Sequence, residues 1–240
     1  MIFAAGLGSR LYPLTESKPK ALVEICGKTL LEITINQLKS FGIQEFVINV
    51  HHFADQIINY LRTNNYFNSK IIVSDESSLL LDTGGGLKKA EDFLKDDSPI
   101  LIHNVDILSD MDFETFINQH NSKGKEIIAS IVVNSRKSGR VFLENDNHFL
   151  CGWKNLNTGE EKIPNPQNNL HPVSFCGIHL VNSTIFNLIS LEGVFSMVDV
   201  YLHLCKNEKI ICYKDNSKWM DVGTIDKLEQ AQSLFDKRFK

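Results

Sequence analysis

The stretch that decides the fold reads AAGLGSRLYPLTESKPKAL and covers residues 4–22. An apolar run at residues 2–5 leads into it, which predicts a short strand that ends in a glycine-rich turn. In a parallel sheet such a turn lies at the carboxyl edge, where ligands bind. Glycines let the backbone approach a ligand closely, and backbone N–H groups can then point at phosphate oxygens. Arg10 adds a planar guanidinium that suits phosphate oxygens, so the stretch predicts a phosphate-binding turn.

Short apolar runs and longer amphipathic stretches alternate along the first half of the chain. Runs typical of buried strands cover residues 2–5, 45–50, 71–73, 99–107 and 127–133. Helical spacing of apolar residues covers 30–40, 53–61, 87–94 and 112–121. Strands that alternate with helices of this length predict βαβ units. The expected fold class is therefore α/β, with a Rossmann-like, mostly parallel twisted sheet and helices on both faces.

The pattern changes after about residue 134. Residues 135–170 are rich in Asn, Gly and Pro and contain strand-like pieces at 140–143 and 149–153. A structureless segment of this length is uncommon inside a compact domain, so we expect hairpins that form a β-rich wall. Further strands are expected at 173–181 and 209–213, and helices at 182–189, 198–206 and 225–239. The sequence has no internal repeat or linker, so we expect one domain over residues 1–240.

Composition places the chain among ordinary globular proteins. Its 240 residues carry 25 Lys and Arg against 29 Asp and Glu, a net charge of −4, which argues against a dedicated nucleic-acid binder. The five cysteines are scattered and form no CxxC pair, so neither a zinc site nor a disulfide framework is expected, and the reducing cytoplasm is the expected location. No run approaches the roughly 18 apolar residues of a membrane span, and no basic stretch precedes the first strand, so we expect neither a membrane span nor a signal peptide.

Other functional patterns fit this sequence poorly. A nicotinamide-binding fold needs a third glycine where Leu11 stands and an acidic residue at the end of the second strand, where the chain has Asn49. The GKT triplet at residues 27–29 resembles the end of a P-loop, but that loop needs a glycine where Leu22 stands. A metal hydrolase and an α/β-hydrolase are also disfavoured, because the sequence contains neither HExxH nor GxSxG.

Further motifs follow the GxGxR turn of residues 6–10 in a fixed order. They are Pro19-Lys20, LDTGGG (81–86), NVD (104–106), FCGIH (175–179) and WMDVGT (219–224). This order resembles that of the sugar-1-phosphate nucleotidyltransferases, also called NDP-sugar pyrophosphorylases, and the resemblance covers essentially the whole chain. The LDTGGG and FxGI forms look most like the bacterial subgroup that includes N-acetylmuramate-1-phosphate uridylyltransferase.

The resemblance implies a fold of the nucleotide-diphospho-sugar transferase type and a defined reaction. A sugar 1-phosphate oxygen attacks the α-phosphorus of an NTP, and pyrophosphate leaves, with Mg²⁺ as the cofactor. Such a transfer needs in-line positioning and neutralisation of crowded negative charge. UTP is the favoured nucleotide, and guanylyl or cytidylyl transfer stays open as an alternative. A regulatory subunit that binds nucleotide or sugar without turnover also stays open, but such proteins typically lose the arginine, lysine or aspartates that this chain retains.

The resemblance also implies roles for individual residues. Arg10 and Lys20 would be catalytic, because they would neutralise the phosphates. Asp106 and Asp221 would hold the metal, since Mg²⁺ prefers oxygen ligands such as carboxylates and phosphates. The nucleotide-binding residues would be Ala4, Ala5, Gly6, Gly8, Ser9, Thr83, Gly84 and Gly85. The sugar-binding residues would be Gly139, Gly177 and Glu161, with Glu160 as an alternative to Glu161.

Structural roles compete with some of these assignments. Asp221 could cap the helix expected from residue 225, and the glycines at 84–85 could form a helix entry turn. Trp153 could stack on a sugar, although packing within its hairpin is the favoured role. Val105 departs from the family pattern, because many relatives have glycine before this aspartate.

The resemblance also divides the expected single domain. Residues 1 to about 134 would form the nucleotide-binding half. Residues of about 135–224 would form the sugar-binding half with the second metal ligand, and 225–240 a C-terminal helix. We expect a monomer or a small homo-oligomer.

Overall fold

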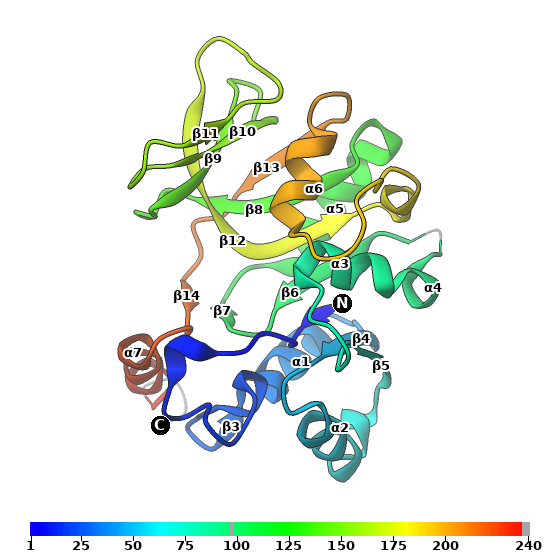
Figure 1. Cartoon of the computed structure of the whole chain (residues 1–240), viewed down its shortest axis with the longest axis vertical. Coiled ribbons are helices and arrows are strands. Elements are labelled where there is room, and N and C mark those ends of the chain that lie inside the picture. The colour runs from blue at the N-terminus through cyan, green and yellow to red at the C-terminus, as the bar shows by residue number, and fades with distance from the viewer. Residues whose placement is uncertain (97, 237–240) are drawn as a thin grey trace. The chain divides into compact units, whose positions relative to one another are not determined.

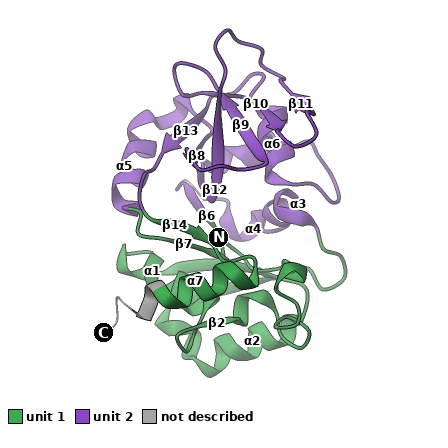
Figure 2. Ribbon diagram, turned by 90° about the vertical axis from the view of Figure 1, so that its left-hand side faces the viewer, with its two compact units in different colours: residues 1–80, 103–111, 218–240 green, residues 81–102, 112–217 purple. Residues whose placement is uncertain are grey.

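The computed structural model describes residues 1–96 and 98–236 of the chain (Figure 1). These residues form two compact units (Figure 2). Unit 1 comprises residues 1–80, 103–111 and the described residues from 218 onward. Unit 2 comprises the described residues of 81–102 and 112–217. Each unit is therefore assembled from segments that are far apart in the sequence.

Unit 1 is built on a parallel sheet. Its strands are β1 (Ile2–Phe3), β4 (Glu45–Val50), β5 (Lys70–Asp75) and the last residues of β6 (Ile100–Asn104). β1 pairs in parallel with both β4 and β6, and β4 pairs in parallel with β5. Helix α1 (Leu30–Ser40) connects β1 to β4, and α2 (Ala54–Thr63) connects β4 to β5. These βαβ connections confirm the predicted α/β class.

The strand order of unit 1 reverses at β1. From β1 the chain moves to β4 and then to β5 on one side, whereas β6 lies on the other side of β1. Ligands of open α/β sheets commonly bind at the carboxyl ends of the strands where the order reverses. The glycine-rich turn follows β1 and Asp106 follows β6, so the topology brings both to this edge.

The start of α1 shows how the local sequence sets an element. The Thr29 hydroxyl oxygen accepts a hydrogen bond of 3.1 Å from the backbone N–H of Glu32, which caps the first turn of the helix. The helix then buries Leu31, Ile35 and Leu38. Before it, β2 (Glu24–Ile25) and β3 (Lys28–Thr29) form a small antiparallel pair. The GKT triplet thus comprises a turn residue at Gly27 and strand β3, whose last residue, Thr29, caps α1.

Smaller elements complete unit 1. β7 (Ile107–Ser109) pairs antiparallel with β14 (Trp219–Asp221), and α7 (Ile225–Asp236) follows β14. The connecting segments contain three 3-10 helices: η1 (Ser9–Leu11), η2 (Lys20–Leu22) and η3 (Asn65–Asn68). The pairing of β7 with β14 places two sequence motifs, NVD and WMDVGT, beside each other.

Unit 2 contains the β-rich part of the chain. Its strands are β8 (Ala129–Asn134), β9 (Arg140–Glu144), β10 (Leu150–Asn155), β11 (Glu161–Lys162), β12 (His171–Val181) and β13 (Ile210–Lys214). They neighbour one another in the order β11-β10-β9-β12-β8-β13, and only the β8–β13 pair is parallel. The expected wall of hairpins is therefore present. The strand pairs are thus largely antiparallel in unit 2, whereas β1, β4, β5 and the end of β6 pair in parallel in unit 1.

Helices of unit 2 are short. They are α3 (Asp82–Lys89), α4 (Glu91–Leu94), α5 (Phe113–Lys123) and α6 (Met197–Leu204), with the 3-10 helices η4 (Gly124–Glu126) and η5 (Ser183–Asn187). Asp112 caps α5, and Ser196 with Asp199 forms a capping box on α6. Among the described residues of both units, none of the helices has the length and apolar character needed to cross a membrane.

Some expected elements differ from the structure. The helix expected at 87–94 is two helices, because α3 begins at Asp82, includes the three glycines and ends before Ala90. Glycine has a low helix propensity, so the sequence pattern placed this start too late, and tertiary packing overrides the propensity. The strand expected at 99–107 ends at Asn104, and the helix expected at 182–189 is only the 3-10 helix η5. The helix expected at 225–239 is α7, and residues 237–240 lie outside the described residues.

The compact units divide the chain at other points than the functional halves predicted at about residue 134, and the functional division stays a prediction. Asp221 was expected in the sugar-binding half, but it lies in unit 1 because β14 pairs with β7. Residues 83–85 were expected in the nucleotide-binding half, but they lie in unit 2. Long-range strand pairing, such as that of β7 with β14, sets the boundaries of the compact units.

A buried histidine in β6 gives unit 1 a pH-dependent stability. His103 is fully buried and its Nδ1 donates to the Asn104 carbonyl oxygen at 2.8 Å. Burial lowers the pKa of His103 to about 4, although that hydrogen bond and the Asp106 charge oppose the shift. Below pH 6.5 the unfolded chain binds a proton at this histidine that the folded chain does not bind. The free energy of unfolding should therefore fall as pH drops from 6.5 to 4, by about 3 kcal/mol from this residue.

Urea unfolding at pH 7.5 and pH 4.5 measures this effect. We expect His103→Gln to lose less stability between the two pH values than the unaltered chain. The exposed His203 provides the control, and His203→Gln should retain the full loss. An equal loss in the His103→Gln and His203→Gln variants would show that His103 does not contribute.

Candidate functional site

The glycine-rich turn after β1 lies directly against the segment that carries Lys20. Gly8 has a φ of 67°, a left-handed conformation that favours glycine. The Thr15 hydroxyl donates a hydrogen bond of 2.9 Å to the Gly8 carbonyl oxygen. A Cβ atom at position 8 would lie 3.0 Å from the Cβ of Lys20, so a larger residue would push the two segments apart. Ala4 is buried at the end of β1, and Gly6 is exposed in the turn.

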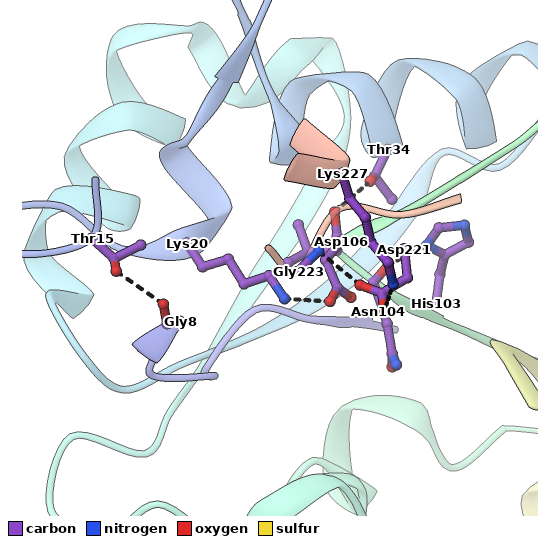
Figure 3. A network of polar contacts seen from close by, with 11 residues as sticks. Gly8, Thr15, Lys20, Thr34, His103, Asn104, Asp106, Asp221, Gly223 and Lys227 are labelled. Atoms are coloured by element: carbon purple, nitrogen blue, oxygen red, sulfur yellow. Dashed lines mark hydrogen bonds and ion pairs between the residues drawn. The ribbon is translucent and has the colours of Figure 1, made fainter. Parts of the chain in front are cut away.

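Lys20 and Asp106 form an ion pair beyond the end of β6 (Figure 3). Lys20 is the first residue of η2, and Asp106 lies in the turn between β6 and β7. Their side chains are only 12% and 15% exposed. Partial burial strengthens the attraction between the charges relative to water. One cation and one anion are thus held at the carboxyl edge of the unit 1 sheet.

Asp221 lies beside Asp106 because β14 is paired with β7 (Figure 3). The Val222 N–H donates to the Asp106 carbonyl oxygen at 2.9 Å, which fixes the two segments together. The Asp221 carboxylate accepts from the Gly223 N–H at 2.7 Å and from Lys227 Nζ at 3.0 Å. The Asp221 side chain thus binds a lysine side chain of the first turn of α7 and the Gly223 N–H, whereas a helix cap would accept from a backbone N–H of that turn.

Opposing effects set the charge of Asp221. Burial raises its pKa, but the hydrogen bond and charge of Lys227, the Gly223 N–H and the charge of Lys20 outweigh burial. The pKa of Asp221 therefore lies below its ordinary value, and the side chain is a carboxylate at neutral pH.

The Arg10 guanidinium reaches the same place from the glycine-rich turn. A Cβ atom built on Gly223 would lie 2.8 Å from Arg10 Nη2 and 2.6 Å from Asp221 Oδ1. The side chains of Arg10 and Asp221 therefore both lie close to the Gly223 backbone. In this arrangement there is space only for a glycine at position 223. The edge of the sheet combines the cations Arg10, Lys20 and Lys227 with two carboxylates.

These residues can handle an anion and a divalent cation together. Guanidinium and ammonium groups bind phosphate oxygens, and two neighbouring carboxylates are the protein ligands that Mg²⁺ commonly uses with phosphates and waters. The described residues contain no group of three or more His, Cys, Asp or Glu side chains that could hold a metal by themselves. A metal here would therefore take its remaining ligands from substrate and water.

The expected nucleotide-binding residues of unit 2 have structural partners. Thr83 Oγ1 accepts from the Met197 N–H at 2.9 Å, and the N–H groups of Gly84 and Gly85 both donate to the Phe195 carbonyl oxygen. A Cβ atom on Gly85 would lie 2.6 Å from the Gly193 carbonyl oxygen, and one on Gly84 would meet the Phe195 ring. Close packing by itself thus explains why positions 84 and 85 are glycines, independently of any role in nucleotide binding.

The expected sugar-binding residues of unit 2 lie on β12, on β11 and in the segment just before β9. Gly177 has a φ of 75° where the β12–β8 register shifts, which requires a glycine-like conformation. Glu161 is exposed on β11 and pairs with Lys154 at 2.9 Å. Gly139 faces Asn157, which would be only 2.5 Å from a Cβ atom.

Trp153 lies under the ammonium of Lys162, with 5.8 Å between Nζ and the ring centroid. Lys162 is its cross-strand partner on β11. This contact supports the packing role within the hairpin.

Lys227 and Thr15 are site residues that the sequence analysis missed. Lys227 binds Asp221, and Thr15 fixes the Gly8 carbonyl group. A signal for Lys227 was present, because a lysine in the first turn of a helix is unfavourable beside the positive end of the helix dipole. Thr15 had no such signal, since its partner is set by how the turn folds back.

Comparison with known proteins gives consistent similarities. The sequence profile of the family described as "Nucleotidyl transferase" matches residues 1–238. N-acetylmuramate alpha-1-phosphate uridylyltransferase of Neisseria meningitidis is 30% identical over 234 residues, which cover 98% of this chain and 96% of that relative. Mannose-1-phosphate guanyltransferase of Aspergillus oryzae is 30% identical over 227 residues, which cover 93% of this chain and 60% of that relative.

A solved structure shows the same fold. UDP-glucose pyrophosphorylase from Acinetobacter baumanii superposes with a TM-score of 0.78 at 16% identity. The match covers 98% of this chain and 91% of that one. At this level of identity the similarity concerns the fold alone.

Proposed function

We propose that this chain, which belongs to the nucleotidyl transferase family, transfers a nucleoside monophosphate from an NTP to a sugar 1-phosphate and releases pyrophosphate. The observation that carries the proposal is the convergence of Arg10 and Lys20 on Asp106 and Asp221 at the carboxyl edge of the unit 1 sheet. Two anionic substrates repel each other, so a site that joins them needs cations at their junction.

The cations supply charge at different points of the reaction. Arg10 is carried by the glycine-rich turn, so its guanidinium would hold the β- and γ-phosphates and stabilise pyrophosphate as it leaves. Lys20, a flexible point charge, would bridge the α-phosphate and the sugar phosphate. The backbone N–H groups of Gly6, Gly8 and Ser9 would cradle the triphosphate. Ala4 and Ala5 would leave room for the base.

Asp106 and Asp221 would hold Mg²⁺, since both are oxygen donors that lie side by side (Figure 3). Bound there, the metal would polarise the α-phosphate and screen the phosphate charge. Lys20 and Lys227 neutralise the two carboxylates, so they keep two anions close together without mutual repulsion.

UTP is the proposed nucleotide and N-acetylmuramate 1-phosphate the proposed acceptor, because the Neisseria relative of that name aligns over nearly its whole length. Thr83, Gly84 and Gly85 would contribute to nucleotide binding, and Gly139, Glu161 and Gly177 to sugar binding. We propose a cytoplasmic enzyme that acts as a monomer or a small homo-oligomer.

Pyrophosphate release tests the proposal. The four common NTPs are each combined with Mg²⁺ and with N-acetylmuramate, N-acetylglucosamine, glucose and mannose 1-phosphates. We expect release with UTP and N-acetylmuramate 1-phosphate to exceed the other pairs by at least about ten-fold. Preferred release with GTP or CTP would overturn the choice of base, and no release from any pair would favour a subunit that binds without turnover.

Gly223→Ala should weaken turnover through crowding alone. The added methyl group would meet Asp221 Oδ1 at 2.6 Å and Arg10 Nη2 at 2.8 Å, so both side chains must move. A displacement of about 1 Å in a positioned group can lower the rate about 100-fold. Steady-state kinetics measure the loss, and thermal unfolding checks that the chain is folded. A folded variant with unaltered kcat/KM would contradict the placement of Arg10 and Asp221.

A further inference from the structure

A buried amide and a buried carboxylate meet at the carboxyl ends of β4 and β5. Asn49 is 3% exposed and Glu76 is completely buried. Asn49 Nδ2 donates to Glu76 Oε1 at 2.8 Å. We call these two residues the strand-end pair. Burial of a carboxylate is costly unless hydrogen bonds compensate it, so a residue of this kind at a ligand-binding edge calls for a role.

The strand-end pair joins three parallel strands. Asn49 Oδ1 accepts from the Ala4 N–H at 2.8 Å, and Ala4 is the first residue beyond β1. The Glu76 N–H donates to the Val50 carbonyl oxygen at 2.7 Å, and His51 Nδ1 donates to the Glu76 carbonyl oxygen at 2.7 Å. Side-chain and main-chain hydrogen bonds thus tie the carboxyl ends of β1, β4 and β5 together, and the bond from Ala4 to the Asn49 side chain lies just beyond the end of β1.

The same contact fixes where the glycine-rich turn begins. Ala4 is held by Asn49 at one end of the turn, and Gly8 is held by the Thr15 hydroxyl at the other. The segment between these fixed points carries Gly6 and Leu7, which are exposed. A loop that is held at both ends needs less ordering when a ligand binds, and this raises affinity.

We propose that the strand-end pair is a positioning device for the NTP, in which Asn49 and Glu76 hold the backbone N–H groups of the glycine-rich turn in their binding arrangement. This proposal rests on the proposed function, because it takes the turn to be the triphosphate site. Neither residue needs to touch the substrate. Their effect passes through the Ala4 N–H.

The partners of Asn49 determine which substitutions preserve the device. The Ala4 N–H can only donate and the Glu76 carboxylate accepts, so position 49 needs one acceptor and one donor. Asn49→Asp loses the donor and places two carboxylates together in a buried site. Adding Glu76→Gln restores the contact in reverse, because the new amide can donate to the new carboxylate. The double variant also keeps the net charge of the unaltered chain.

The test compares Asn49→Asp, the double variant Asn49→Asp/Glu76→Gln and the control Ser74→Ala. Ser74 is 2% exposed and lies on β5 two residues before Glu76, so the control also alters a buried polar side chain. We expect Asn49→Asp to raise the KM for UTP about ten-fold, with the KM for the sugar 1-phosphate changed less than two-fold. The double variant should return the KM for UTP to within about three-fold of that of the unaltered chain. The control Ser74→Ala should have the same KM for UTP as the unaltered chain.

Amide hydrogen exchange provides a measurement that does not depend on turnover. We expect faster exchange at residues 4–9 in Asn49→Asp and recovery in the double variant, with the rest of the unit 1 sheet unaltered. Unchanged exchange at residues 4–9 would contradict the claim that the strand-end pair holds the glycine-rich turn in place. Faster exchange with an unchanged KM for UTP would overturn its role in NTP binding. A chain that shows the exchange pattern but no turnover with any NTP would retain the device and refute the proposed function.

Discussion

Asp106→Asn is expected to lower kcat about 1,000-fold while the chain stays folded. The substitution keeps the size of the side chain but removes the negative charge that pairs with Lys20 and would hold the metal. The Asp106 carbonyl group still accepts from the Val222 N–H, so the contact between the β7 and β14 segments should survive. The loss should appear in kcat, because the charge is needed most where the phosphates crowd in the transition state.

Asp110→Asn is the matched control for this substitution. Asp110 lies four residues downstream and is exposed, and its Oδ1 accepts from the Lys218 N–H at 2.6 Å. An asparagine oxygen can accept the same hydrogen bond, so kcat should stay within about two-fold. Circular dichroism and thermal unfolding of both variants separate a lost charge from a lost fold. Comparable kcat values for the Asp106→Asn and Asp110→Asn variants would contradict the metal-binding role.

Lys20→Ala is expected to lower kcat about 100-fold to 1,000-fold, which corresponds to about 2.7–4 kcal/mol of transition-state stabilisation. The Lys20 side chain is only 12% exposed and its ammonium pairs with Asp106, so the charge acts in partly desolvated surroundings where it has a large effect. Its removal also leaves the Asp106 carboxylate without this partner. The KM for UTP should change less than kcat does, because the glycine-rich turn is intact and would still bind the triphosphate.

Lys18→Ala is the control for Lys20→Ala. Lys18 lies two residues earlier in the same connecting segment, so its substitution by alanine removes the same charge from the chain. Steady-state kinetics of both variants show whether the effect depends on position or only on net charge. A similar small loss in both variants would indicate that Lys20 is an ordinary solvated lysine.

Local elements were largely predictable because their signals are local. The strand at 45–50 and the helix at 30–40 have the observed bounds of β4 and α1, since their apolar periodicity lies within the elements themselves. The prediction was wrong for α3, whose glycines are helical because they pack against residues 193–196. It was also wrong for residues 182–189, where only a short 3-10 helix forms.

The site could be predicted as a set of residues, but not as a geometry. Arg10, Lys20, Asp106 and Asp221 were all chosen from sequence motifs, and the structure brings them to one edge of unit 1. The contacts among them depend on the pairing of β7 with β14, which are both three-residue strands with no distinct pattern of their own. No local signal connects residue 107 to residue 221.

The sequence by itself determined the α/β class, the position of the glycine-rich turn and the identity of Arg10, Lys20, Asp106 and Asp221. Periodicity and glycines are properties of short segments, and the order of motifs can be read directly along the chain. Only the tertiary structure decided that Asp221 joins unit 1, that Lys227 binds it, and that Asn49 and Glu76 tie the strand ends to Ala4. Asp221 and Lys227 lie near each other in the sequence but on different elements, and the other contacts join residues that are far apart along the chain. The partners of Asn49 and Glu76 are selected by burial and hydrogen bonding within the packed unit, and such selection leaves no pattern in the neighbouring sequence.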